Sequence, residues 1–144
     1  MKRELSTLIL LLSIVSASAQ KLTIESFSLD ASDITASSQQ RLDGNGDACA
    51  LVKVQIAEPG ATFDGNIVGD VAYKVNQYWV YMTSGSKRLQ VNHPHYLPLD
   101  ISFADYGINS VKGKMTYVLT LALPDKIIVE RTQDLVIKVT PQDA

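Results

Sequence analysis

Apolar and polar residues alternate along most of the chain after residue 48, with the period of two that a β-strand requires. The runs 52–56, 97–103 and 117–123 place apolar side chains at every second position. Each such strand has one face to bury and one face that can meet water, as antiparallel sheets require. The other expected strands are 22–29, 78–82, 89–91 and 135–139.

Turn-forming residues separate these runs, as in Glu58-Pro59-Gly60, Asp64-Gly65-Asn66 and Ser84-Gly85-Ser86. No segment has a capped apolar stripe at helical spacing. Short strands at close, regular intervals predict an all-β fold, an antiparallel β-sandwich of roughly seven to nine strands, either immunoglobulin-like or of the kind that the resemblance described below implies. The apolar phase of the runs predicts a core of Val52, Val54, Ile56, Val80, Leu89, Val91, Leu99, Ile101, Leu119, Leu121 and Ile137.

One segment departs from the alternating pattern. Residues 30–48 are rich in Ser, Asp, Gln and Gly, and they predict a long surface loop with one helical turn near Ser37 to Arg41. Long loops in compact domains are often functional. The contact surfaces we expect are therefore this loop and the tips at 64–66 and 84–87, with an unpaired edge strand as the alternative.

The first nineteen residues predict export from the cell. Lys2 and Arg3 precede the apolar run 8–15, and Ala17-Ser18-Ala19 offers small residues for cleavage before Gln20. This order is typical of a secretory signal peptide, and the run is too short to span a bilayer. We expect residues 20–144 to form one domain in the periplasm or at the cell exterior, because no interdomain linker is evident.

The mature chain is mildly acidic and has one cysteine. Removal of residues 1–19 leaves 125, with 11 Lys+Arg (13 less Lys2 and Arg3) against 14 Asp+Glu (15 less Glu4), a net charge of −3. This balance argues against nucleic acid and anionic membranes as partners, and no later run is long enough for a transmembrane helix. Cys49 is interpreted as a small buried hydrophobe, with an intermolecular disulfide as the alternative.

A family resemblance begins at Cys49. The segment "CALVKVQI" is followed by "GDVAYKVNQYWVYMTSGSKRLQVNHPHYLPLDISF", which has a glycine-bounded tip, an alternating strand and the aromatic and proline residues of "HYLPL". Over residues 41–124 this order resembles the PEGA-like domain, a β-sandwich of bacterial surface and periplasmic proteins related in architecture to carboxypeptidase regulatory domains. The lead-in "RLDGNGDACALVKV" resembles that of secreted Gram-negative proteins. The resemblance implies a non-catalytic envelope module and supplies no catalytic residues.

Two clusters contain side chains of the kind that bind metal ions. Asp43-Gly44-Asn45-Gly46-Asp47 opens like a calcium loop, but Ala48 and Val54 occupy the sixth and twelfth positions, where a calcium hand needs Gly and Glu. We therefore interpret it as a tight turn. His93 and His95 supply too few ligands for zinc, and we interpret them as part of a strand-to-strand turn. No metal or cofactor is predicted.

The densest aromatic cluster is Tyr78, Trp79 and Tyr81. On a strand, Tyr78 shares one face with Val80 and Met82, whereas Trp79 and Tyr81 point to the other face. That second face is either covered or exposed as a platform for a sugar ring or a partner protein. The candidate binding residues are Trp79, Tyr81, Arg41, Asp43 and Asp47.

The chain lacks the arrangements that catalysis requires. No Gly-x-Ser-x-Gly elbow, P-loop or dinucleotide fingerprint is present, and the two histidines sit beside each other. We therefore expect no enzyme activity and no catalytic residues. The predicted function is that of an envelope binding or accessory module acting through protein–protein contacts. The alternative is a carbohydrate-binding module that uses an aromatic platform on a cell-surface glycan.

Overall fold

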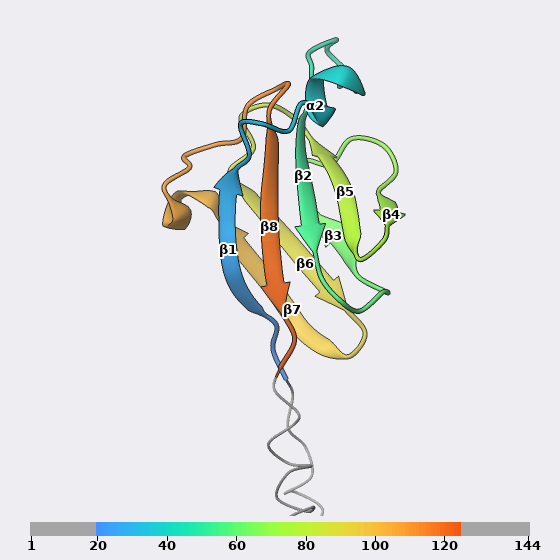
Figure 1. Ribbon diagram of the computed structural model, residues 1–144, viewed down its shortest axis with the longest axis vertical. Helices are drawn as coiled ribbons and strands as arrows, with labels where there is room; N and C mark the ends of the chain where they lie inside the picture. Colours follow the sequence, from blue (N-terminus) through green and yellow to red (C-terminus); the bar gives the residue numbers. More distant parts are fainter. Residues whose placement is uncertain (1–19, 125–144) are drawn as a thin grey trace, which may run out of the picture.

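The computed structural model describes residues 20–124, which form eight strands in two facing sheets (Figure 1). This arrangement confirms the all-β sandwich. The predicted signal peptide at 1–19 and the strand predicted at 135–139 lie outside the described residues. One sheet has the order β1 (Thr23–Leu29), β8 (Thr116–Ala122), β2 (Ala50–Gln55), β5 (Gln77–Met82) and β4 (Ala72–Lys74). The other has the order β3 (Thr62–Asp64), β6 (Arg88–His93) and β7 (Tyr96–Ser102).

The sandwich is not wholly antiparallel, which corrects the prediction. Strands β2 and β8 run parallel at the centre of the larger sheet, with Val52 opposite Tyr117 and Val54 opposite Leu119. All other strand pairs of the described residues are antiparallel. Only a hairpin forces an antiparallel pair. The chain between β2 and β8 instead passes through the second sheet, so it can return in the parallel direction.

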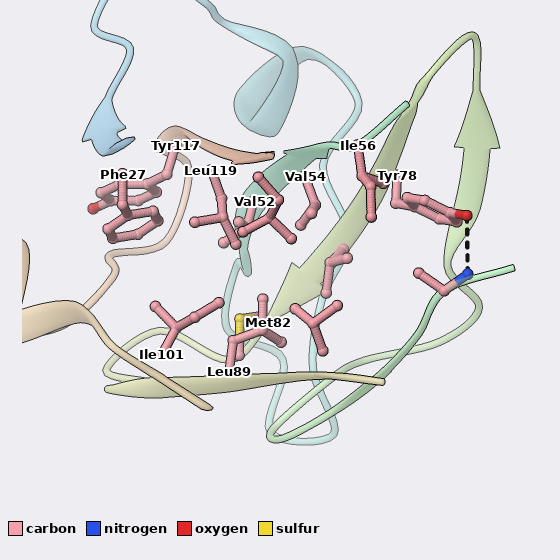
Figure 2. Close-up of a cluster of buried hydrophobic side chains, with 14 of the residues drawn as sticks. Phe27, Val52, Val54, Ile56, Tyr78, Met82, Leu89, Ile101, Tyr117 and Leu119 are labelled. Carbon is pink, nitrogen blue, oxygen red and sulfur yellow. Dashed lines mark hydrogen bonds between the residues drawn. The ribbon is translucent and has the colours of Figure 1, made fainter. Parts of the chain in front are cut away.

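The core lies between the sheets and matches the predicted phase of the strands (Figure 2). Leu119, Val52 and Val54 point from the larger sheet toward Leu89 and Ile101 of the smaller one. Leu99 is only partly buried, although it packs against the core, and Ile137 lies outside the described residues. The other predicted core residues are buried, namely Val52, Val54, Ile56, Val80, Leu89, Val91, Ile101, Leu119 and Leu121.

The run 97–103 is where the alternating pattern fails. Alternation puts Leu97 on the apolar phase, yet this residue is 40% exposed. Phe103 is buried but lies in a 3-10 turn, η1 (Phe103–Tyr106). The pairing of β6 with β7 slips where Val91 opposes Leu99 and His93 opposes Tyr96, so β7 has one extra residue. Such a bulge reverses the side-chain phase. Leu97 therefore faces away from the core.

The two ends of the sandwich differ. Strand directions place the segments 30–48, 65–70, 83–87 and 103–115 at the upper end of Figure 1, whereas β1 begins and β8 ends at the lower end. The helical turn predicted near Ser37 to Arg41 is present, but it lies a few residues earlier in the chain, where it forms α2 (Thr35–Ser38). The helix begins at Thr35 because the carboxylate of Asp33, two residues before it, accepts the Thr35 N–H at 2.9 Å.

We expect Leu119→Ala to lower the free energy of unfolding by about 2–5 kcal/mol, because Leu119 is fully buried and truncation leaves a cavity. Leu97→Ala is the matched control and should change it by less than about 0.5 kcal/mol, as surface substitutions do. Urea denaturation followed by Trp79 fluorescence measures both values. Equal effects of the two substitutions would contradict the observed strand phase.

Candidate functional site

Two loop tips that were predicted separately form one hollow at the upper end. The Thr83 N–H donates to the Asn66 carbonyl at 3.0 Å, which brings the tips 64–66 and 84–87 together. The hollow between them has a volume of about 280 Å³. We call this site the tip hollow; it is lined by Gly65, Asn66, Gly85, Lys87 and Arg88.

Two glycines give the tip hollow its shape, and two basic residues give it a positive charge. Gly65 and Gly85 have φ values of +147° and +96°, a backbone region that residues with a Cβ rarely adopt. Lys87 and Arg88 are exposed. Arg88 has only a loose, solvated ion pair with Asp100, at 3.8 Å. Both cations are therefore accessible to an acidic or polar partner group.

Arg41 acts as an internal brace. Its Nη1 donates to the carbonyls of Val68 at 2.8 Å and Asp70 at 2.9 Å, and its guanidinium carbon lies 4.3 Å from the centre of the Tyr81 ring. A Cβ at Gly69 would come within 2.8 Å of the Arg41 Nη1, so glycine makes room for the brace. Replacing Arg41 would therefore disturb the loop as well as any contact surface.

Asp43 organises the turn that the sequence predicted. Its carboxylate accepts the backbone N–H groups of Asn45 at 2.8 Å and Asp47 at 3.0 Å, while its own N–H donates to the Asp47 carbonyl. These bonds confirm the tight-turn interpretation. The Asp47 side chain is exposed at the rim of the loop. Within residues 20–124, no group of three or more His, Cys, Asp or Glu residues is arranged to hold a metal ion.

Trp79 and Tyr81 lie on the outer face of the larger sheet, and the chain itself covers much of both rings. Tyr81 is 5% exposed, its hydroxyl donates to the Gln39 carbonyl at 2.7 Å, and burial raises its pKa. Trp79 is half-buried, with the ammonium groups of Lys53 and Lys74 at 4.8 and 4.5 Å from its ring. These two rings therefore offer little free surface for sugar stacking, and their binding role stays a prediction.

An ion pair ties the long loop to this outer face. The Lys53 Nζ donates to the Asp33 carboxylate at 2.6 Å, and the Thr35 N–H donates to the same carboxylate. Burial alone would raise the pKa of Asp33, but the hydrogen bonds from Lys53 and Thr35 outweigh it and hold the pKa below 3.8. The Ala36 N–H donates to the Thr116 hydroxyl, which seats α2 on the sheet.

Cys49 is inside the molecule. It is fully buried in a second apolar cluster with Ala36, Leu51 and Tyr81, which lies under the long loop. Burial raises the pKa of its thiol, so the reactive thiolate is disfavoured. The structure confirms the interpretation of Cys49 as a buried hydrophobe, and an intermolecular disulfide would require this cluster to open.

The sequence did not reveal an aromatic pocket on the flank where β3 and β4 form the sheet edges. The Phe63 and Tyr73 rings lie 5.2 and 4.7 Å from the Tyr78 ring. Tyr73 is 46% exposed at the mouth. We call this site the flank pocket; its volume is about 310 Å³ and it is lined by Ala61, Thr62, Phe63, Val71, Tyr73 and Tyr78.

The two histidines meet a glutamate at the lower end. The Tyr96 hydroxyl donates to the Glu58 carboxylate at 2.7 Å, and the His95 Nδ1 lies 3.4 Å from the same carboxylate. The hydrogen bond from Tyr96 lowers the pKa of Glu58, and the same bond raises the pKa of Tyr96. A histidine with Asp100 or Asp105 in a cleft would have favoured an enzyme. Asp100 instead pairs with Arg88.

The comparisons with known proteins returned no match: no family model matches the chain, nor does any curated protein or solved structure. The resemblance to the PEGA-like domain therefore stays a prediction that rests on the residues quoted above. Within residues 20–124, no helix is long and apolar enough to cross a membrane.

We expect Asp33→Asn to destabilise the protein by about 1–2 kcal/mol near neutral pH, because it breaks a partly buried, charge-assisted pair. The folded-state pKa of Asp33 is lowered, so its contribution is present above pH ~4 and is lost as the pH falls through that pKa. Denaturation of both proteins from pH ~7 to ~2 should therefore show the difference shrinking in acid. Glu25→Gln, at an exposed position of β1, should show no such trend.

Cys49 should react with a thiol reagent only when the protein unfolds. Its thiol is fully buried, so we expect Ellman's reagent to label the native protein at least about 100 times more slowly than the urea-unfolded protein. Absorbance at the reporter wavelength follows the labelling. Comparable rates in the two states would mean that the outer cluster opens readily.

Proposed function

We propose that the chain is a non-catalytic binding module of a bacterial cell envelope, which acts through protein–protein contacts. One observation carries the proposal: the tip hollow and the long loop gather at one end of a rigid sandwich, while β1 begins and β8 ends at the other. Loops on a rigid scaffold are where binding proteins place recognition. Such a module can be attached at its lower end and still present its loops.

The chemistry of the tip hollow favours an acidic partner surface. Lys87 and Arg88 are exposed and only loosely paired, and the side chain of Asn66 adds an amide beside them. Complementary charge speeds encounter and excludes partners of like charge. Of the residues predicted from sequence, exposed Asp47 belongs to the same end, whereas Arg41 and Asp43 support the loop from within.

A carbohydrate-binding module is the second candidate, and the flank pocket is the observation that favours it. Three aromatic rings line that pocket, and Tyr73 is partly exposed beside Thr62. Aromatic rings give a sugar both apolar contact and orientation. This candidate places the sugar in the flank pocket rather than on Trp79 and Tyr81, which the chain covers.

Export from the cell would support a role in the envelope, and it can be tested separately from binding. The signal-like residues 1–19 carry this part of the proposal. The intact mass of the exported protein should correspond to a chain that begins at Gln20. A secreted form that keeps residues 1–19 would contradict this route of export.

Charge reversal in the tip hollow tests the binding role. We expect Lys87→Glu with Arg88→Glu to weaken capture of an envelope partner by at least about tenfold, because two exposed contact charges change sign. The tagged full chain is cross-linked in envelope extracts, and the captured proteins are quantified by mass spectrometry. Circular dichroism checks that the variant keeps its fold.

Lys21→Glu with Lys74→Glu is the matched control, since both are exposed lysines away from the tip hollow and the net charge changes by the same amount. Capture that falls equally with both variants would reflect net charge and contradict a site at the tips. Capture that is lost only with Tyr73→Ala would move the site to the flank pocket. Turnover of a glycoside, ester or peptide by the purified protein would overturn the non-enzyme proposal.

A further inference from the structure

His93 is held in one protonation state by the two bonds that its ring makes. Its Nδ1 accepts the His95 backbone N–H at 3.1 Å, and its Nε2 lies 2.9 Å from the Pro59 carbonyl. A ring nitrogen that accepts a hydrogen bond carries no proton, so Nδ1 is bare and Nε2 donates to Pro59. His93 is 7% exposed, and both of its ring nitrogens are satisfied only when the ring is neutral.

A second proton would disrupt this arrangement. Protonation places a hydrogen on Nδ1, where it meets the His95 N–H, and two donors then face each other. The imidazole ring is rigid, so a rotation that separates these donors also swings Nε2 away from the Pro59 carbonyl. That carbonyl belongs to the turn 58–60, which the ring fastens to the β6–β7 hairpin.

The neighbouring charges do not remove this conflict. Glu58, His95 and Tyr96 are the titratable groups of the described residues that face the His93 ring. The Glu58 carboxylate attracts a charged His93, but it already accepts the Tyr96 hydroxyl and lies beside His95. His95 is largely exposed, and its Nδ1 lies 3.4 Å from the same carboxylate. With both rings charged, two imidazolium rings 5.3 Å apart would share one carboxylate.

The turn that His93 holds leads directly into the flank pocket. Ala61 follows the turn, and its N–H donates to the Tyr78 hydroxyl at 3.1 Å. Ala61, Thr62 and Phe63 form one stretch of the pocket lining, and Tyr78 belongs to the same lining. Loosening of the turn would therefore also loosen this stretch and expose the aromatic rings between the sheets.

We propose that His93 is an acid-sensitive latch: its protonation frees the Pro59 carbonyl, so that the turn 58–60 stays attached to the β6–β7 hairpin only through the Tyr96–Glu58 bond and loosens beside the flank pocket. The latch depends on the two hydrogen bonds of the His93 ring and on the hydrogen bond from the Ala61 N–H to the Tyr78 hydroxyl. It is independent of what the tip hollow binds, because the turn lies at the opposite end of the sandwich.

Amide hydrogen exchange of the full chain tests the latch, read residue by residue by NMR. Between pH ~7.5 and ~5.5, after correction for intrinsic exchange, we expect protection of Gly60, Ala61 and Thr62 to fall at least about tenfold. The amides of β2 and β8 serve as the internal reference and should keep their protection. The ring-nitrogen shifts of His93 should change over the same pH range as the loss of protection.

Two matched variants distinguish the contribution of His93 from that of His95. His93→Gln keeps a donor for the Pro59 carbonyl but takes up no proton, so protection at 60–62 should no longer depend on pH. His95→Gln leaves the His93 ring in place and should retain the acid response. Unchanged protection of the wild type across this range, or a loss confined to residues 94–96, would overturn the latch. If His93→Gln does not fold, the match between the His93 ring shifts and the loss of protection decides.

Discussion

Strand β2 is buried on both faces, and the rest of the structure depends on that constraint. Val52 and Val54 enter the core between the sheets, while Leu51 enters the outer cluster with Cys49 and Tyr81. A strand with two apolar faces needs cover on both sides. The second sheet supplies one cover, and the segment 30–48 supplies the other at the upper end. The long loop is thus a structural layer as well as a surface.

Polar contacts hold that outer layer in place where apolar contacts are few. The Lys53–Asp33 pair and the Arg41 brace connect the loop to β2 and to the β3–β4 connection. A partly buried pair of this kind fixes position more than it adds stability, because desolvation offsets much of the attraction. Arg41 and Lys53 also cover the Tyr81 and Trp79 rings. The contacts that order the loop therefore cover much of the aromatic face that sequence alone left open as a platform.

The sequence predicted the features that period two and turn chemistry encode, and it missed those that depend on distant contacts. The inward phase of β2, β5, β6 and β8 follows from alternation. The parallel pairing of β2 with β8 and the bulge that exposes Leu97 have no local signal. Hairpin β4–β5 was missed because its turn is Val75-Asn76, with φ values of 21° and 62°, where Asn-Gly would be typical. The flank pocket was missed with it. The tip hollow was foreseen as two glycine turns, but their meeting was not.

Different kinds of hydrogen bond hold the loop tips at the upper end of the sandwich and the turn 58–60 at the lower end. At the upper end, glycines with positive φ and backbone bonds shape the tips, so their form does not depend on a titrating side chain. At the lower end, the turn 58–60 is held by side chains of His93 and Tyr96. Bonds to ionisable side chains change with pH, whereas backbone bonds do not. The glycine-shaped tips at the upper end therefore keep their form across the pH range in which the proposed His93 latch would act on the flank pocket, whereas the long loop beside them still depends on the Asp33 and Asp43 carboxylates.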